Sequence, residues 1–328
     1  MEMLAEEVPT LPGACCARFD RVTWHRWQAG SLPFYFGGDV DNIKEKKAIV
    51  ASFSGGQTSG FMCSALEKHY GPGVVNYLFY DTGAEHPKTY DFIKHVNDFY
   101  DLNITCLQGY FDQELGKPHD YKVVGVESLG TDLKVYRDMV GKYGTPSVVA
   151  PWCSSRMKDD VNRKYCNEKF GKDNYEVWLG IRIDEPKRLR IGQGKLRYLA
   201  EISDFEKEDI NQFWRDMPFS LGIQEWLGNC VFCPKKSTLK IAAACRDEPG
   251  LLNDWKSMID SAIERDGQER ISRHYMYRES RRIEDIEAEY STISRDDIIS
   301  RIRNGKYLDT NSCSESCEVF MSQPDFFK

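Results

Sequence analysis

The feature that most constrains the fold is an alternation of short apolar runs with helix-like segments, which begins at Lys46. Runs that suit strands occupy residues 48–53, 74–80, 103–108, 176–181 and 197–202, and segments that suit helices occupy 58–70, 87–100 and 207–216. Buried strands joined by helices are typical of a parallel sheet with right-handed crossovers. The sequence therefore predicts an α/β fold, with a Rossmann-like, doubly wound parallel sheet and a mainly helical C-terminal part.

The same pattern divides the chain into four segments. We expect an N-terminal extension over residues 1–45, the α/β domain over 46–228, a cysteine-knuckle and helical region over 229–305, and a polar tail over 306–328. A long excursion, Gly109–Val149, interrupts the α/β rhythm, and excursions of this length usually have a function or contain small elements of their own.

Composition is that of an ordinary globular protein. The 328 residues are 41% hydrophobic and 29% charged, which is enough for a sizeable core. No apolar run approaches the roughly 18 residues of a membrane span, and the acidic start of the chain is unlike a secretory signal. We therefore expect a cytoplasmic protein with no membrane partner. The net charge of −7 argues against indiscriminate nucleic-acid binding but allows a local basic groove.

The turn between the first strand and the first helix reads SGGQTS, residues 54–59. Its glycines permit backbone conformations that a side chain would block, and its hydroxyls can hydrogen-bond to the backbone. Such a turn leaves amides at a helix N-terminus, where they can bind an anion. It lacks the lysine of a Walker loop and the glycine spacing of a Rossmann fingerprint. A simple tight turn is the alternative.

A second motif, Asp81-Thr82-Gly83 followed by Glu85, comes after the second strand. The carboxyl ends of parallel strands share one sheet edge, so we expect this motif beside residues 54–59. In this order the two motifs resemble the N-type ATP pyrophosphatases of the adenine nucleotide alpha hydrolase superfamily. Within it, they are similar to the phosphoadenosine phosphosulfate (PAPS) reductase-like branch, including phage, bacterial and DNA phosphorothioation-type members. The resemblance implies a HUP-type fold whose 54–59 loop holds the phosphates of ATP.

A third motif, GIRIDEPKR over residues 180–188, is similar to a Gly-Ile-Arg-x-Asp-Glu pattern of the same branch. Arginine suits planar recognition of phosphate or sulfate, and carboxylates suit a ribose or a metal-bound pyrophosphate. We expect Arg182 to contact an anionic substrate rather than a structural carboxylate, with Asp184 and Glu185 as orienting or metal-contacting groups. A solvated charged loop is the alternative.

Four cysteines form a candidate metal site: Cys153, Cys230, Cys233 and Cys245. Cys230 and Cys233 form a Cys-x-x-Cys-Pro knuckle that could turn two thiolates onto one metal. Cys153 precedes two basic residues and is a plausible third ligand, and Cys245 is the expected fourth. Iron–sulfur members of the superfamily combine similar cysteines, which implies a 4Fe–4S cluster. A zinc site and free thiols remain alternatives.

A basic and aromatic stretch, RHYMYRESRR at residues 273–282, could grip a nucleic acid. Arginines beside glutamates more often form an ion-paired, solvated face, and we favour that interpretation.

The resemblance implies two chemistries for the chain. In the first, ATP is cleaved to AMP and pyrophosphate to activate an acceptor for sulfur transfer, as in tRNA thiolation or DNA phosphorothioation. The implied partners are then a nucleic-acid acceptor, a cysteine desulfurase as sulfur donor, and Mg²⁺ on the phosphates. In the second, the substrate is an adenylyl sulfate, which is reduced. A non-catalytic nucleotide-binding protein is a further alternative, because the usual Lys-Asp of the loop is replaced by Gln57-Thr58.

The candidate site residues follow from these motifs. We assign catalytic roles to Asp81, Arg182 and Asp184. We assign nucleotide binding to Ser54, Gly55, Gly56, Gln57, Thr58, Ser59, Asp81, Thr82, Gly83, Gly180, Ile181, Arg182 and Arg188.

Overall fold

The structure is a computed structural model that describes residues 47–114, 116–189 and 194–305, all within the compact unit Glu45–Lys328. The expected N-terminal extension and polar tail lie outside the described residues. No helix in the described ranges is both long and apolar enough to cross a membrane.

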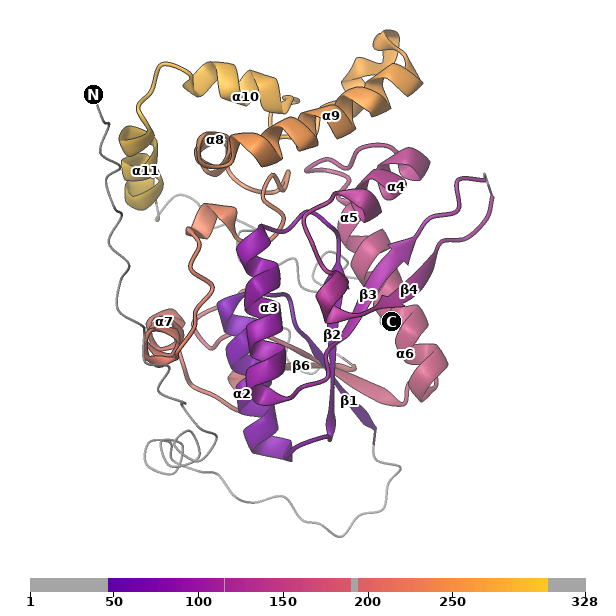
Figure 1. Cartoon of the computed structure of the whole chain (residues 1–328), viewed down its shortest axis with the longest axis vertical. Helices are drawn as coiled ribbons and strands as arrows, with labels where there is room; N and C mark the ends of the chain where they lie inside the picture. Colours follow the sequence, from indigo (N-terminus) through magenta and orange to yellow (C-terminus); the bar gives the residue numbers. More distant parts are fainter. Residues whose placement is uncertain (1–46, 115, 190–193, 306–328) are drawn as a thin grey trace, which may run out of the picture. The chain divides into compact units, whose positions relative to one another are not determined.

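The described residues form a six-stranded sheet with the order β4-β3-β2-β1-β5-β6 (Figure 1). Its strands are β1 (Ala48–Ser52), β2 (Val75–Asp81), β3 (Thr105–Tyr110), β4 (Asp120–Val124), β5 (Tyr175–Leu179) and β6 (Leu196–Tyr198). All neighbouring strands pair in parallel except β3 and β4, which are antiparallel. The predicted α/β, Rossmann-like fold is confirmed. The antiparallel edge strand is a correction to the parallel sheet, and it arises because the long excursion turns back along β3.

The helices alternate with the strands and then continue beyond the sheet. They are α2 (Gln57–Tyr70), α3 (Pro87–Tyr100), α4 (Lys134–Tyr143), α5 (Trp152–Ser154), α6 (Asp160–Phe170), α7 (Lys207–Asp216), α8 (Thr238–Asp247), α9 (Pro249–Asp266), α10 (Ile283–Tyr290) and α11 (Arg295–Asn304). A π-helical turn, η2 (Ser155–Asp159), joins α5 to α6. The 3₁₀ turns are η1 (Val126–Ser128), η3 (Leu199–Glu201), η4 (Glu225–Leu227) and η5 (Gln268–His274). The strand expected over 197–202 is shorter, because η3 begins at Leu199.

Local sequence signals explain where several helices begin. α3 starts with Pro87, whose missing N–H costs nothing at a first helical position, and His86 before it accepts a hydrogen bond from the Lys88 amide. Ser237 and Ser294 accept backbone hydrogen bonds in the same way at the starts of α8 and α11. These caps satisfy amides that the helix itself leaves unpaired.

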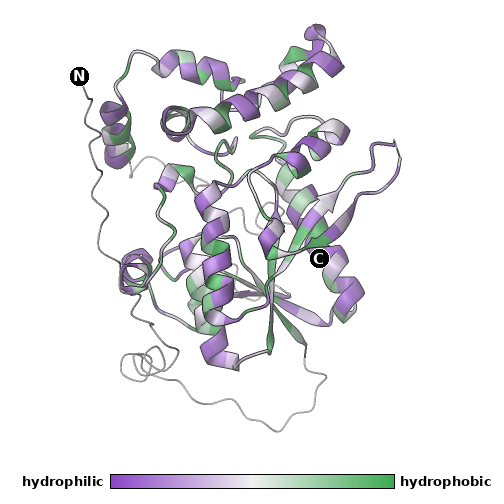
Figure 2. Cartoon of the chain, viewed as in Figure 1, coloured by the Kyte–Doolittle hydropathy of each residue, from purple (hydrophilic) through white to green (hydrophobic). Residues whose placement is uncertain are grey.

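The sheet is covered on both faces, which is why its central strands are almost wholly apolar. Val50, Val177 and Leu107 pack with α6 residues in one buried cluster. On the other face, Tyr77 and Phe79 of β2 contact α2 and α3 respectively, and α2 also packs on α7. Figure 2 shows the hydrophobic colour concentrated along the strands, with much of α9 and α10 hydrophilic.

The helices after the knuckle share their core with the α/β part. A single buried cluster contains Tyr136 and Met157 together with Phe232, Trp255 and Ile283. The core therefore continues across the boundary expected near residue 228, and the knuckle packs beside the carboxyl end of β2.

Candidate functional site

The strand order places a topological switch point at β1. The chain winds outward from β1 through β2 and β3 on one side, and through β5 and β6 on the other. Ligands of open α/β sheets bind outside the carboxyl ends of the strands at such a point. The segments that follow β1 and β5 are residues 54–59 and 180–188, which are two of the predicted motifs.

These two segments touch each other. A Cβ added to Gly180 would lie 3.0 Å from the Ser59 Cα, so only glycine permits this close approach. The Arg182 Nη1 donates a hydrogen bond of 3.1 Å to the Thr58 Oγ1. The structure thus brings together the predicted residues that follow β1 and β5.

Hydrogen bonds within the 54–59 loop fix its shape. The Ser59 hydroxyl accepts from the Ser54 amide at 3.2 Å and donates to the Gly56 carbonyl at 3.0 Å. The Ser54 and Ser59 hydroxyl oxygens are 2.9 Å apart. The loop is therefore organised by its own residues and leads directly into α2.

Gly55 and Gly56 are glycines for different reasons. Gly55 has a φ of 77°, and a Cβ there would come within 2.8 Å of the Thr89 Cγ2. Gly56 has an ordinary φ of −92°, and its added Cβ would meet nothing nearer than the Ser54 Oγ at 3.7 Å. Neither backbone strain nor packing within the chain requires glycine at position 56, which is the N-cap of α2.

Trp214 of α7 also holds this loop in place. No sequence motif indicated this residue. Its indole Nε1 donates to the Gln57 carbonyl at 2.8 Å, and its ring lies against Gly60. The two residues of this hydrogen bond are 157 positions apart, so no local pattern could have paired them.

Arg182 pairs with carboxylates of its own motif, and its predicted contact with an anionic substrate stays a prediction. Its guanidinium makes a two-pronged pair with Asp184, with Nε to Oδ1 at 2.8 Å and Nη2 to Oδ2 at 3.3 Å. Its Nη1 is also 3.6 Å from a Glu185 oxygen. Arg182 therefore contacts structural carboxylates as well as Thr58. Its side chain is 7% exposed, so its main structural effect is to connect the 54–59 loop to the segment after β5.

Arg188 is different. Its Nη1 pairs with Glu185, whereas its Nε and Nη2 are buried atoms without a hydrogen-bond partner in the described part of the chain. Buried donors are rarely left unpaired in native proteins. Two donors beside the switch point can therefore accommodate the oxygens of an anion.

Asp81 organises the turn after β2. Its Oδ1 accepts from the Gly83 amide at 2.9 Å and from the Tyr90 hydroxyl at 2.7 Å, and its Oδ2 accepts from Gln108 at 2.7 Å. Both oxygens are engaged and the residue is 1% exposed, so the geometry gives Asp81 a positioning role. Burial, together with the nearby Glu85, raises the pKa of the Asp81 carboxyl to about 6.

This pKa gives the stability of the protein a pH dependence. The folded-state pKa lies above the ordinary 3.8, so folding favours the protonated carboxyl. That contribution is present below about pH 4 and is lost as the pH rises to about 6. As the pH is raised from 4 to 7.5, the free energy of unfolding of wild type, measured with urea, should fall by up to about 3 kcal/mol relative to that of Asp81→Asn. A difference between the two proteins that does not change with pH would contradict this assignment.

Glu85 links the Asp81 turn to the cysteine knuckle. Its carboxylate accepts from the Thr82 hydroxyl at 2.6 Å and from Tyr90 at 3.1 Å. The Cys230 thiol lies 3.7 Å from the same carboxylate, and the Lys158 ammonium lies 3.9 Å from it.

The backbone reinforces this link. Glu85 and Cys230 form an antiparallel bridge, and the Val231 amide donates to the Ala84 carbonyl at 3.0 Å. The sequence analysis placed Glu85 in the motif but did not foresee its contact with Cys230. Nor did it foresee Tyr90, whose role depends on a tertiary contact.

The predicted metal ligands are brought together only in part. Burial raises the pKa of the Tyr136 phenol well above its ordinary value, and the neighbouring thiols of Cys153, Cys230 and Cys233 add to the shift. Burial likewise raises the pKa of the Tyr277 phenol, with Cys245 and Cys233 adding to the shift, and burial raises the pKa of the Cys245 thiol to about 12.

Within the described ranges, no group of three or more His, Cys, Asp or Glu side chains is arranged to hold a metal ion. The proposed four-cysteine set does not fit as a preformed site, and we derive no chemical step through a metal.

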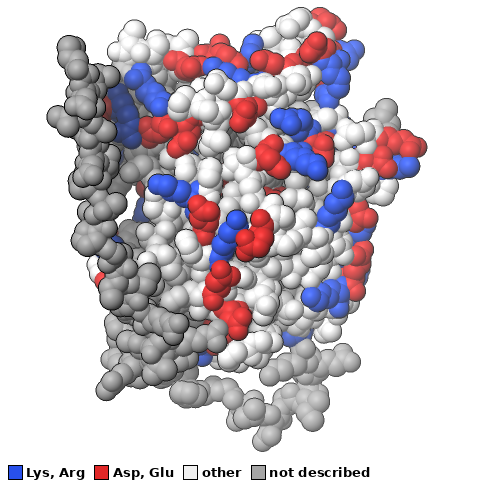
Figure 3. All heavy atoms as spheres, in the orientation of Figure 1, with Lys and Arg blue, Asp and Glu red and all other residues white. Residues whose placement is uncertain are grey.

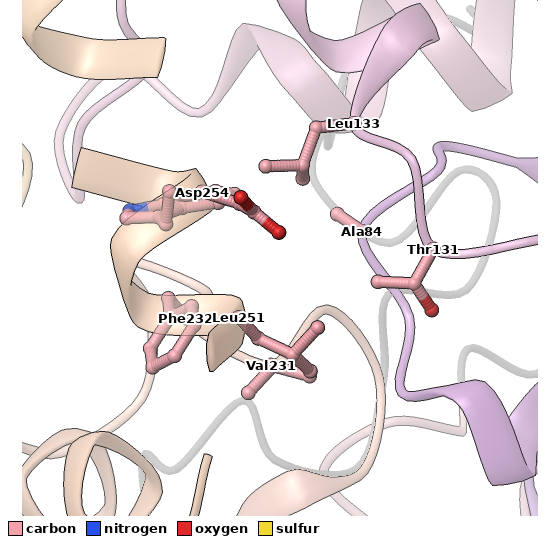
Figure 4. Close-up of a pocket in the computed structure, with 8 residues that line it drawn as sticks. Ala84, Thr131, Leu133, Val231, Phe232, Leu251 and Asp254 are labelled. Atoms are coloured by element: carbon pink, nitrogen blue, oxygen red, sulfur yellow. The ribbon is translucent and has the colours of Figure 1, made fainter. Parts of the chain in front are cut away.

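A small hollow opens beside the knuckle, away from the 54–59 loop. It is lined by Ala84, Thr131, Leu133, Val231, Phe232, Leu251, Asp254 and Trp255. Figure 4 shows the Asp254 carboxylate on one side, with Ala84 and Thr131 on the other. The lining is mostly apolar, so this hollow does not suit a polyphosphate.

Most side chains of the basic and aromatic stretch at 273–282 form ion pairs within the protein or are buried. Arg281 pairs with Glu279 and Glu289, and the Arg282 Nη2 pairs with Glu284 at 3.0 Å. His274 and Tyr277 are buried. On the face drawn in Figure 3, basic and acidic side chains are interspersed. These contacts support the ion-paired interpretation.

Comparison with known proteins identifies the class. Residues 48–116, which include the first two motifs, match the phosphoadenosine phosphosulfate reductase domain family. The chain belongs to this nucleotide-binding family, within the adenine nucleotide alpha hydrolase superfamily, and the predicted resemblance is confirmed.

Two relatives extend the match. The chain is 46% identical over 281 residues to the uncharacterized nin region protein ORF290 of Escherichia phage lambda, covering 84% of this chain and 97% of the phage protein. It is 22% identical over 224 residues to an uncharacterized protein of Methanocaldococcus jannaschii, covering 65% of this chain and 47% of that protein.

Proposed function

We propose that the protein binds ATP at the switch point and cleaves it to AMP and pyrophosphate, which activates an acceptor for sulfur transfer. In this reaction an acceptor oxygen attacks the α-phosphorus and pyrophosphate leaves. A sulfur nucleophile then displaces AMP from the acceptor. Mg²⁺ would accompany the phosphates and offset their charge.

The main support for the proposal is the open space where a side chain on Gly56 would lie. A Cβ on Gly56 would make only ordinary contacts, with the Ser54 Oγ at 3.7 Å and the Ser59 Oγ at 4.0 Å, and the residue is the N-cap of the 14-residue helix α2. Amides at a helix N-terminus point at an anion and the helix dipole favours its charge, so a phosphate can approach the backbone closely. The unpartnered Arg188 donors support the same anion from the neighbouring loop.

Each residue has a defined task in this proposal. The 54–59 loop holds phosphates, and Arg182 ties it to the segment after β5 through Thr58. Arg182 would therefore act by orientation, and Arg188 would supply charge directly. Asp81 and Glu85 hold the turn that carries Thr82 and Gly83.

The sulfur step is supported by the position of the knuckle. The Cys230 Sγ lies 3.5 Å from the Thr82 Oγ1, so a thiol stands directly against the turn after β2. The same thiol favours a second candidate function, the reduction of an adenylyl sulfate by thiol attack on sulfur.

The test is to incubate purified protein with radiolabelled ATP and Mg²⁺, with and without tRNA or duplex DNA. The proposal expects acceptor-dependent release of pyrophosphate and AMP. Sulfite release from an adenylyl sulfate with a thiol reductant would favour the reductase. ATP binding without any turnover under either condition would leave a non-catalytic nucleotide-binding protein.

A further inference from the structure

Thr89 of α3 carries a buried hydroxyl that forms no hydrogen bond. The residue is 2% exposed, and its Oγ1 has no partner in the described part of the chain. Its Cγ2 would lie 2.8 Å from a Cβ added to Gly55, so the side chain packs directly against the loop after β1. The methyl group of Thr89 therefore faces the predicted phosphate loop, and its hydroxyl is left without a partner among the described residues.

The missing hydrogen bond is unusual for this residue type. A threonine in a helix can satisfy its hydroxyl on the carbonyl three or four residues before it. The other two threonines that are buried within the described ranges are paired: the Thr82 Oγ1 donates to Glu85 at 2.6 Å, and the Thr145 Oγ1 donates to the Arg273 carbonyl at 3.2 Å. Valine would fill the same space as Thr89 without the cost of an unpaired buried hydroxyl.

We propose that the Thr89 hydroxyl donates a hydrogen bond to a phosphoryl oxygen held by the 54–59 loop. This inference rests on the proposed function and adds a ligand contact from α3. Thr89 lies in the first turn of α3, directly after the Asp81–Glu85 turn, so it stands between the two loops. A change of χ1 to another staggered rotamer can bring Oγ1 to the place that Cγ2 now occupies against Gly55.

The test compares binding with stability. Titration calorimetry with a non-hydrolysable ATP analogue, and separately with pyrophosphate, should show Thr89→Val binding roughly tenfold more weakly than wild type, because a hydrogen bond to a charged group is lost. The melting temperature of Thr89→Val should be equal or higher. Thr145→Val is the matched control: it should melt at a lower temperature and bind the analogue like wild type.

A second pair of variants distinguishes loss of the hydroxyl from a folding defect. Thr89→Ser and Thr89→Ala differ by the hydroxyl alone, and the serine variant should bind the analogue more tightly than the alanine variant. Equal affinities in each comparison, with wild type binding well, would overturn the role of Thr89 but not the proposed function. Wild type that binds neither ATP analogue nor pyrophosphate would overturn both.

Discussion

The Gly56→Val variant is expected to bind ATP at least about 100-fold more weakly than wild type while keeping its melting temperature. The position has a φ of −92° and a ψ of 162°, which valine adopts readily. A Cβ there would meet the Ser54 Oγ at 3.7 Å and the Ser59 Oγ at 4.0 Å, both ordinary contacts, so the loop itself has room for it. The added side chain would occupy the space through which a phosphate reaches the helix amides.

Gly125 provides the matched control for this experiment. It precedes a short helical turn with a φ of −75° and a ψ of 149°, and a Cβ there would meet nothing within 4 Å. Gly125→Val should therefore bind ATP like wild type. The measurement is titration calorimetry beside thermal unfolding. If a folded Gly56→Val protein bound ATP with wild-type affinity, the assignment of the nucleotide site to this loop would be wrong.

The second large effect is expected at Arg182. Replacing Arg182 with alanine should lower the free energy of unfolding by about 3–5 kcal/mol, because it leaves the partners of a buried ion pair uncompensated. Asp184 would lose both of its hydrogen bonds to the guanidinium, and Glu185 would lose its ion pair with Arg182 while keeping Arg188 and the backbone amide of residue 182. ATP binding should weaken as well, since the tie to Thr58 disappears.

Arg182→Lys separates charge from geometry. Lysine keeps the positive charge but cannot reproduce the planar fork that spans Asp184 and Thr58. Urea unfolding should place this variant between wild type and Arg182→Ala, while ATP binding stays impaired in both. If Arg182→Ala unfolded at the wild-type urea concentration, the ion pair would not be holding the two segments together.

The parts of the site that the sequence predicted are those with local signals. The Ser-Gly-Gly turn follows an apolar run directly, and Pro87 marks the start of α3 within its own motif. The carboxyl ends of parallel strands share one sheet edge, which is why the loops after β1 and β2 were expected beside each other.

The remaining parts depend on side chains that meet across long stretches of sequence. Trp214 reaches Gln57 from a separate helix, and Cys230 reaches Glu85 through the knuckle. The pairing of Arg182 is local instead. Asp184 lies two residues away and accepts from the guanidinium, and the predicted contact of Arg182 with an anionic substrate stays a prediction.

The bridge between Glu85 and Cys230 also bears on how the protein reaches its native state. The two residues are 145 positions apart, and closing so long a loop is entropically costly before the contacts around it have formed. Long-range pairing of this kind slows folding relative to local helices and hairpins. We therefore expect the contact between the turn after β2 and the knuckle to form late in folding. A nascent chain that has emerged only as far as β6 would contain the 54–59 loop and the turn after β2 but not the knuckle that contacts this turn.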